Sequence, residues 1–184
     1  IRKERADMLG LIARQDLDEE VERFKDAPEN THLKLNLKGR NPDDGMTSIA
    51  YDKGFMFLKT LENVAGRENF DVFLKNYFQS HAFSTMTTDK FIKYLNENLL
   101  EKHSLSFNTD EWIFNPGVPS NAFEIKSDKF ENVSKILKTI IETNKADVSV
   151  TKDWTTQEWV YFIRNFPKDI TPSQMGIIDN AFNL

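Results

Sequence analysis

The chain has 184 residues, 39% of them hydrophobic, with 15 phenylalanines and a formal net charge of −5. This size allows one domain or two small ones around an apolar core. The negative charge argues against nucleic acid as a partner, because phosphate binding needs basic patches. No apolar run reaches the roughly 18 residues of a membrane span, and the lack of cysteine excludes disulfides and thiol catalysis but leaves the compartment open.

The first quarter of the chain combines one helix with one long loop. Apolar residues at helical spacing predict a helix over residues 3–25. Prolines, glycines, asparagines and aspartates predict a loop over residues 26–46. Within this loop, alternation over Leu33–Leu37 predicts a short extended segment with one face packed. A loop of about 20 residues inside a compact domain is often functional.

Four helices are predicted next, over residues 48–65, 68–80, 88–101 and 109–114. Gly66 is a typical end signal for the first of them. Thr87 or Thr88 is expected to cap the third helix, and Asn108 or Thr109 the fourth. A Pro-Gly turn at residues 116–117 and a connector over residues 118–126 follow.

The last third of the chain is predicted to hold three more helices, over residues 128–143, 155–165 and 171–182. The last two begin with capping boxes, Thr155 to Glu158 and Thr171 to Gln174. Paired short helices are typical of the start of a helical solenoid. Because an open solenoid end lacks a neighbour, Ile177, Ile178 and Phe182 are expected to be less protected than the core residues Phe73 and Leu95.

Tyr51 is the main candidate for a functional residue, because it lies where the polar loop gives way to an apolar helix. A tyrosine at such an entry can direct its hydroxyl into a cleft while its ring stays packed. The alternative is a core aromatic whose hydroxyl contacts a backbone carbonyl. Asp43 and Asp44 follow Asn-Pro, and their alternative role is to shape a turn through hydrogen bonds from side chain to backbone.

Two segments resemble the gluzincin zinc aminopeptidases, in particular the branch of the leukotriene hydrolases. They are Asp43–Phe55 (DDGMTSIAYDKGF) and Trp112–Pro119 (WIFNPGVP). In that family a Tyr-x-Lys-Gly helix start follows the zinc-binding helices, and Trp-x-x-x-Pro-Gly-x-Pro closes the catalytic domain. The resemblance covers residues 1–119 well, and residues 120–184 by position and helical character.

The resemblance implies a mainly α fold in two parts. Residues 1–119 would be the helical lobe of a thermolysin-like catalytic domain, and residues 120–184 the beginning of a C-terminal, armadillo-like domain of helical repeats. It also implies a zinc-dependent enzyme that hydrolyses N-terminal residues from peptide substrates. Tyr51 would be the catalytic residue that stabilises the oxyanion, and Asp43 would line the substrate pocket.

The chain departs from the family in its histidines. The family binds zinc through H-E-x-x-H and a later glutamate, whereas no two of His32, His81 and His103 are four residues apart. We therefore expect a fragment that begins after the zinc ligands, binds no metal and is inactive alone, with zinc held by the full-length protein. Two alternatives stay open: epoxide hydrolysis of a lipid, and a non-catalytic helical scaffold or protein-binding module.

Overall fold

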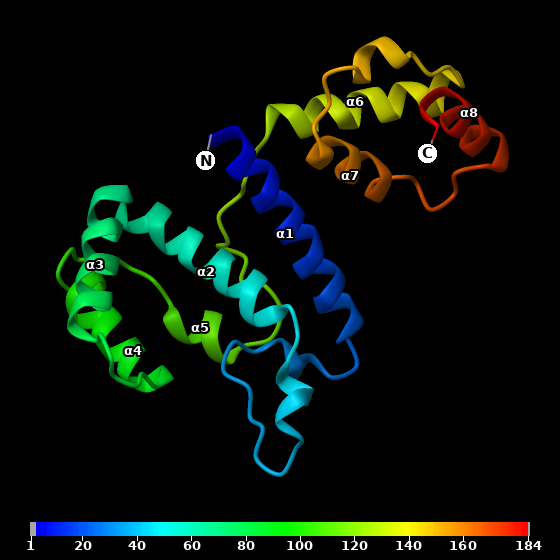
Figure 1. The fold of residues 1–184 in the computed structure, drawn as a ribbon. Helices are drawn as coiled ribbons and strands as arrows, with labels where there is room; N and C mark the ends of the chain where they lie inside the picture. Colours follow the sequence, from blue (N-terminus) through cyan, green and yellow to red (C-terminus); the bar gives the residue numbers. More distant parts are fainter. Residues whose placement is uncertain (1–2, 184) are drawn as a thin grey trace. The chain divides into compact units, whose positions relative to one another are not determined.

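A computed structural model describes residues 3–183 and divides them into two compact units. The first unit is Arg14–Glu124, and the second joins the described residues before Arg14 to those from Ile125 onward. One border falls inside the first helix, α1 (Lys3–Arg23). Residues 3–183 contain helices and turns but no strand, so the prediction of a mainly α fold is confirmed (Figure 1). The assignment of residues 1–119 and 120–184 to two functional domains stays a prediction.

The first unit follows the predicted order of helices with one difference. Its elements after α1 are η1 (Pro28–Thr31), η2 (Pro42–Gly45), α2 (Ile49–Ala65), α3 (Arg67–Ser80), α4 (Thr88–Leu95), η3 (Asn96–Leu100) and α5 (Thr109–Phe114). The helix expected to run to residue 101 changes at Asn96 into a π-helical turn that buries Leu99 and Leu100. Thr87 and Asn108 cap α4 and α5 through the backbone N–H groups of Lys90 and Glu111.

The long loop of the first unit is ordered by two 3₁₀ turns, η1 and η2. Between them the three leucines at 33, 35 and 37 are half-buried, while the polar residues at 34, 36 and 38 are exposed. The predicted alternation of packed and solvated side chains is therefore confirmed. The segment pairs with no strand among the described residues, and its Lys34 N–H donates instead to the carbonyl of Ile113 at 3.1 Å.

The core of the first unit is built around α2, which packs against α3. Phe57 of α2 lies 5.9 Å from the ring of Trp112 and 5.7 Å from that of Phe107, measured between ring centroids. Trp112 is fully buried, as expected for a packing residue. The other buried apolar residues of this unit come from every helix: Leu17, Ile49, Met56, Leu61, Ala65, Phe70, Phe73, Leu95, Leu99, Leu100 and Ile113.

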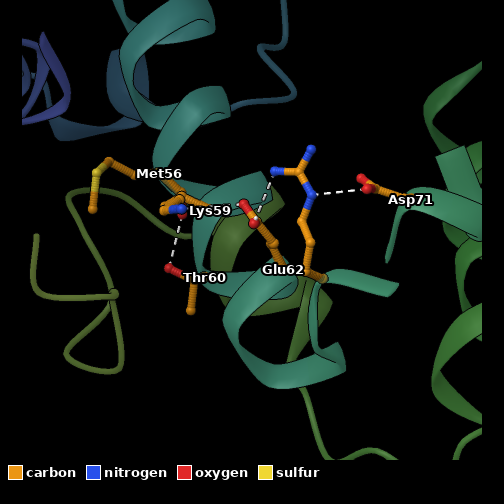
Figure 2. Close-up of polar contacts among 6 residues, drawn as sticks. Met56, Lys59, Thr60, Glu62 and Asp71 are labelled. Carbon is orange, nitrogen blue, oxygen red and sulfur yellow. Dashed lines mark hydrogen bonds and ion pairs between the residues drawn. The ribbon is translucent and has the colours of Figure 1, made fainter. Parts of the chain in front are cut away.

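Gly66 joins α2 to α3 and is the only residue between them. Its backbone has φ +77° and ψ 146°, a conformation that is nearly confined to glycine. One ion pair crosses this joint: Glu62 of α2 accepts a hydrogen bond from Arg67 of α3 at 3.2 Å, and it also accepts one from Lys59 of its own helix at 3.2 Å (Figure 2). Arg67 also donates to Asp71 at 2.8 Å. Arg67 is exposed, so its ion pairs contribute little and the sharp turn depends mainly on the glycine.

The second unit holds α6 (Asp128–Thr143), η4 (Val148–Thr151), α7 (Thr156–Arg164) and α8 (Pro172–Phe182). Its core is formed by Val133, Leu137, Ile140, Phe162 and Ile178. Both predicted capping boxes are present. No helix within residues 3–183 combines the length and the apolar character that crossing a membrane would require.

One expectation about the second unit is wrong. Ile178 is 0% exposed, so it is no less buried than Phe73 at 2% or Leu95 at 0%. The reason is that α8 packs on α6 and places Ile178 in the common core with Phe162 of α7. Ile177 and Phe182 are half-buried, as expected for residues at the edge of that core.

Replacement by alanine should have opposite effects on stability at Gly66, which follows the end of α2, and at Gly54, which lies inside it. Gly66→Ala should lower the free energy of unfolding by about 1–3 kcal/mol, because the positive φ strains any other residue. Gly54→Ala should raise it by about 0.5–1 kcal/mol, because Gly54 lies inside α2 with open space around its Cα. Urea denaturation of the two variants tests both signs, and equal effects would contradict the role of Gly66.

Candidate functional site

The candidate site begins at η2, which leads the chain into α2. Asn41 starts this turn, and its side-chain oxygen accepts a hydrogen bond from the N–H of Asp43 at 3.1 Å. Pro42 follows at the first position of the turn. Gly45 ends the turn against Leu37, whose Cδ1 would lie 3.0 Å from a Cβ at this position. The lack of a side chain at Gly45 therefore lets the end of the turn pack closely against Leu37.

Tyr51 lies in the first turn of α2 and faces solvent. Its N–H and that of Asp52 both donate to the carbonyl of Ser48 at 2.9 Å. The side chain of Tyr51 is 80% exposed, and its hydroxyl forms no hydrogen bond with residues 3–183. The alternative of a core aromatic bonded to a carbonyl is therefore wrong, and the ring is less packed than the sequence suggested. A catalytic role for Tyr51 stays a prediction.

Tyr51 lines an apolar groove of about 700 Å³ on the first unit. Helix α2 contributes Gly54, Phe55 and Leu58 to the same groove. The rest of the lining comes from the segment after η1, from α3, from the entry to α4 and from α5: Leu33, Leu74, Tyr77, Phe78, Met86, Thr87, Thr88, Phe91 and Ile113, with Ala50 and Phe57 of α2. The groove therefore offers an apolar surface beside an exposed phenol.

Asp43 lies on η2 with its side chain exposed, and it is not part of the groove lining. The turn is shaped by the side chain of Asn41 rather than by either aspartate. Asp44 lies 3.8 Å from Arg40 in an exposed ion pair. The side chain of Asp43 therefore does not shape the turn. Its role in substrate binding stays a prediction.

Lys53 is a further residue of this region, and no role was predicted for it although it belongs to the Tyr-x-Lys-Gly motif. It lies two residues after Tyr51 and is 0% exposed. Its ammonium donates to the backbone carbonyls of Thr31 at 2.9 Å and of Asn115 at 2.8 Å. A signal was present in the sequence, because Lys53 occupies the apolar stripe of α2 four residues after Ile49 and three before Met56.

Burial changes the acid–base properties around Lys53. It lowers the pKa of the Lys53 ammonium from 10.5 to about 8. Burial and, secondly, the charge of Lys53 lower the pKa of His32. Burial raises the pKa of Asp52, an effect opposed by a hydrogen bond from Ser48 and supported by the charge of Asp16. The start of α2 is therefore a partly desolvated environment on the side that faces the interior.

The residues that the structure describes do not fit a zinc site. Among residues 3–183 there is no group of three or more histidine, aspartate or glutamate side chains placed to hold a metal ion. His81 has a local role near the end of α3, where its Nδ1 lies 2.8 Å from the carbonyl of Tyr77. The prediction that zinc belongs to another part of a full-length protein stays a prediction.

Comparison with known proteins gives a consistent set of relatives. Residues 9–112, more than half of the chain, match the model of the peptidase family M1 domain. Leucine aminopeptidase 2 of Ajellomyces capsulatus is 36% identical over 115 residues, which are 59% of this chain and 18% of that protein. A leukotriene A-4 hydrolase homolog of Botryotinia fuckeliana is 29% identical over 192 residues, covering 97% of this chain and 29% of that protein.

Solved structures share the fold of nearly the whole chain. Yeast leukotriene A4 hydrolase matches with a TM-score of 0.80 and 22% identity, over 96% of this chain and 33% of that one. The native hydrolase from Saccharomyces cerevisiae matches with a TM-score of 0.77 and 23% identity, over 96% and 32% of the two chains. This chain therefore spans between about a fifth and a third of the length of these relatives.

The lowered pKa of Lys53 predicts a pH dependence of stability. Between about pH 8 and 10.5 the unfolded chain keeps a proton that the folded chain has released, so stability should rise with pH over this interval. The free energy of unfolding of wild type, relative to Lys53→Met, should therefore be higher at pH 10 than at pH 7.5, by a change of about 1 kcal/mol or more. Urea denaturation at both pH values measures this difference.

Lys59→Met is the matched control, because it removes another lysine from α2 but retains Lys53. Its free energy of unfolding should follow the pH trend of wild type. A Lys53→Met variant with the same trend as wild type would contradict the lowered pKa.

Proposed function

Because the chain belongs to peptidase family M1, we propose that it forms part of a zinc-dependent aminopeptidase that removes N-terminal residues from peptides. The match over residues 9–112 and the relatives named leucine aminopeptidase 2 support this proposal. The zinc ligands are assigned to residues outside these 184, since no H-E-x-x-H occurs among them. The chain alone is accordingly inactive in this proposal, and its contribution is the helical lobe with Tyr51.

The single observation that carries the proposal is the exposed hydroxyl of Tyr51 beside the apolar groove. Attack of water on a peptide carbonyl places negative charge on its oxygen, and a fixed donor near that oxygen stabilises the transition state. A phenol O–H is a hydrogen-bond donor of this kind. Tyr51 therefore supplies a hydrogen bond to the oxyanion, while the groove holds apolar parts of the substrate.

Substitution of Tyr51 tests this role in the full-length enzyme. Tyr51→Phe removes only the hydroxyl and should lower kcat about 100- to 1000-fold with little change in KM, which is typical of the loss of one oxyanion donor. Steady-state hydrolysis of an amino-acid anilide gives both constants. Tyr161→Phe, which removes a hydroxyl bonded to Ser134 in the second unit, is the control and should keep normal turnover.

A Tyr51→Phe variant with more than half of normal turnover would remove Tyr51 from the mechanism. The helical lobe would then support the enzyme without supplying a catalytic group.

Asp43 is proposed to contact the substrate, and Asp44 offers a matched comparison one residue away. Both side chains are exposed on η2, but Asp44 is paired with Arg40. Asp43→Asn removes a negative charge that can attract the positive or hydrogen-bond-donating groups of a peptide, so KM should rise about tenfold. Asp44→Asn should leave KM within about twofold. Equal effects of the two substitutions on KM would show that only the general charge of the turn matters.

A further inference from the structure

A buried lysine links three segments of the first unit that are far apart in the sequence. Lys53 of α2 donates to Thr31, 22 residues away, and to Asn115, 62 residues away. Thr31 ends η1, and Asn115 follows α5. A buried ammonium is stable only when polar atoms replace its water. The two carbonyls meet that need. If either segment moved away from α2, the Lys53 ammonium would lose a hydrogen-bond acceptor inside the protein.

The two segments that accept from Lys53 are also bonded to each other. The N–H of Gly117 donates to Oγ1 of Thr31 at 2.8 Å, and the N–H of Lys34 donates to the carbonyl of Ile113 at 3.1 Å. The backbone around residues 31–34 is thus connected to that around residues 113–117 at both ends. We refer to these two segments together as the paired wall.

The paired wall carries part of the groove lining. Leu33 and Ile113 belong to it, and both line the groove together with Tyr51. Tyr51 and Lys53 are two residues apart on one helix, about 200° around its axis, so they project to different sides. Accordingly Tyr51 is exposed while Lys53 is buried. The same turn of α2 therefore presents the phenol on one side and holds the paired wall on the other.

We infer that Lys53 is a positioning residue for the proposed reaction: its two hydrogen bonds fix the paired wall, and with it a substrate lying against Leu33 and Ile113, relative to the hydroxyl of Tyr51. This inference rests on the proposed function of Tyr51. It goes beyond that function because it assigns to Lys53 the alignment of a substrate in the groove with the hydroxyl of Tyr51. A displacement of about 1 Å between reacting groups is enough to lower a rate about 100-fold.

Lys53→Met tests the inference, since methionine fills similar space without a donor. In the full-length enzyme kcat should fall about 10- to 100-fold, whereas Lys59→Met on the same helix should stay within about twofold. The positioning role also predicts non-additivity. In a Tyr51→Phe background, Lys53→Met should lower kcat by less than about threefold, because the hydroxyl that it aligns is already missing. An equal loss in both backgrounds would overturn the inference.

A second measurement does not depend on activity. Hydrogen exchange of the amides of Lys34 and Gly117, which form the bonds within the paired wall, should become at least tenfold faster in Lys53→Met, while amides in the middle of α3 stay within about twofold. Unchanged protection of both wall amides would overturn the inference. Normal turnover of Tyr51→Phe would instead contradict the proposed function of Tyr51, and faster exchange in Lys53→Met would then still show that Lys53 holds the paired wall, because the exchange rates report on the wall independently of the chemistry.

Should Lys53→Met fail to fold, Thr31→Val tests whether the paired wall must be fixed, while Lys53 itself is unchanged. It keeps the Thr31 carbonyl that accepts from Lys53 but removes the Oγ1 that accepts from Gly117. Exchange at Gly117 should become faster and kcat should fall below that of wild type. A Thr31→Val variant with wild-type kcat and wild-type exchange at Gly117 would overturn the inference.

Discussion

A protein interior accepts a charged amine only where oxygen atoms take the place of its hydration water. In the first unit this condition is met at Lys53, whose ammonium lies 2.9 Å from the carbonyl of Thr31 and 2.8 Å from that of Asn115. Both acceptors lie at the ends of short helical elements, where carbonyls lack partners within the helix. The lysine needs these oxygens, and the oxygens need a donor. The mutual requirement holds three remote segments together in one arrangement.

The groove beside Tyr51 depends on that arrangement. Its lining is almost wholly apolar, and backbone groups of the adjoining segments are satisfied by Lys53, by Thr31 Oγ1 and within the pair of Lys34 and Ile113. Buried backbone groups without partners would cost too much to leave beside an apolar surface. An apolar lining in turn displaces water from a bound substrate, and a hydrogen bond from a phenol is stronger where water is excluded.

Local rules predicted most of the helices, since apolar spacing and end signals depend on neighbouring residues. Gly66 ended α2, Thr87 capped α4, and the two capping boxes formed as expected. The features that those local rules did not predict depend on tertiary packing. The π-helical turn at Asn96–Leu100 buries two consecutive leucines, and Ile178 is enclosed by helices that no local pattern brings together. Tyr51 could be selected from its position, but its 80% exposure depends on the surrounding groove.

Lys53 was missed because a lysine suggests a solvated face, yet its position in the stripe of α2 carried the signal. Buried residues of this helix recur at Ile49, Lys53, Met56 and Thr60, the spacing of one helical face. Two of the four are polar, and each of these two binds backbone far along the chain. Lys53 donates to Asn115, while Oγ1 of Thr60 accepts from the N–H of Phe123 at 2.9 Å. A polar residue inside an apolar stripe thus marks an anchor for a distant segment.

The spacing of the two anchors also accounts for the shape of the segment that they hold. Lys53 and Thr60 are seven residues apart, which corresponds to about 10 Å along the helix axis. Their partners, Asn115 and Phe123, are eight residues apart and could span about 28 Å if extended. The segment between them is therefore bent rather than fully extended. Gly117, with φ +70°, and the bond from the Ala122 N–H to the Pro119 carbonyl at 3.1 Å provide those bends. The Pro-Gly turn at residues 116–117 thus lies between the two backbone groups that Lys53 and Thr60 hold.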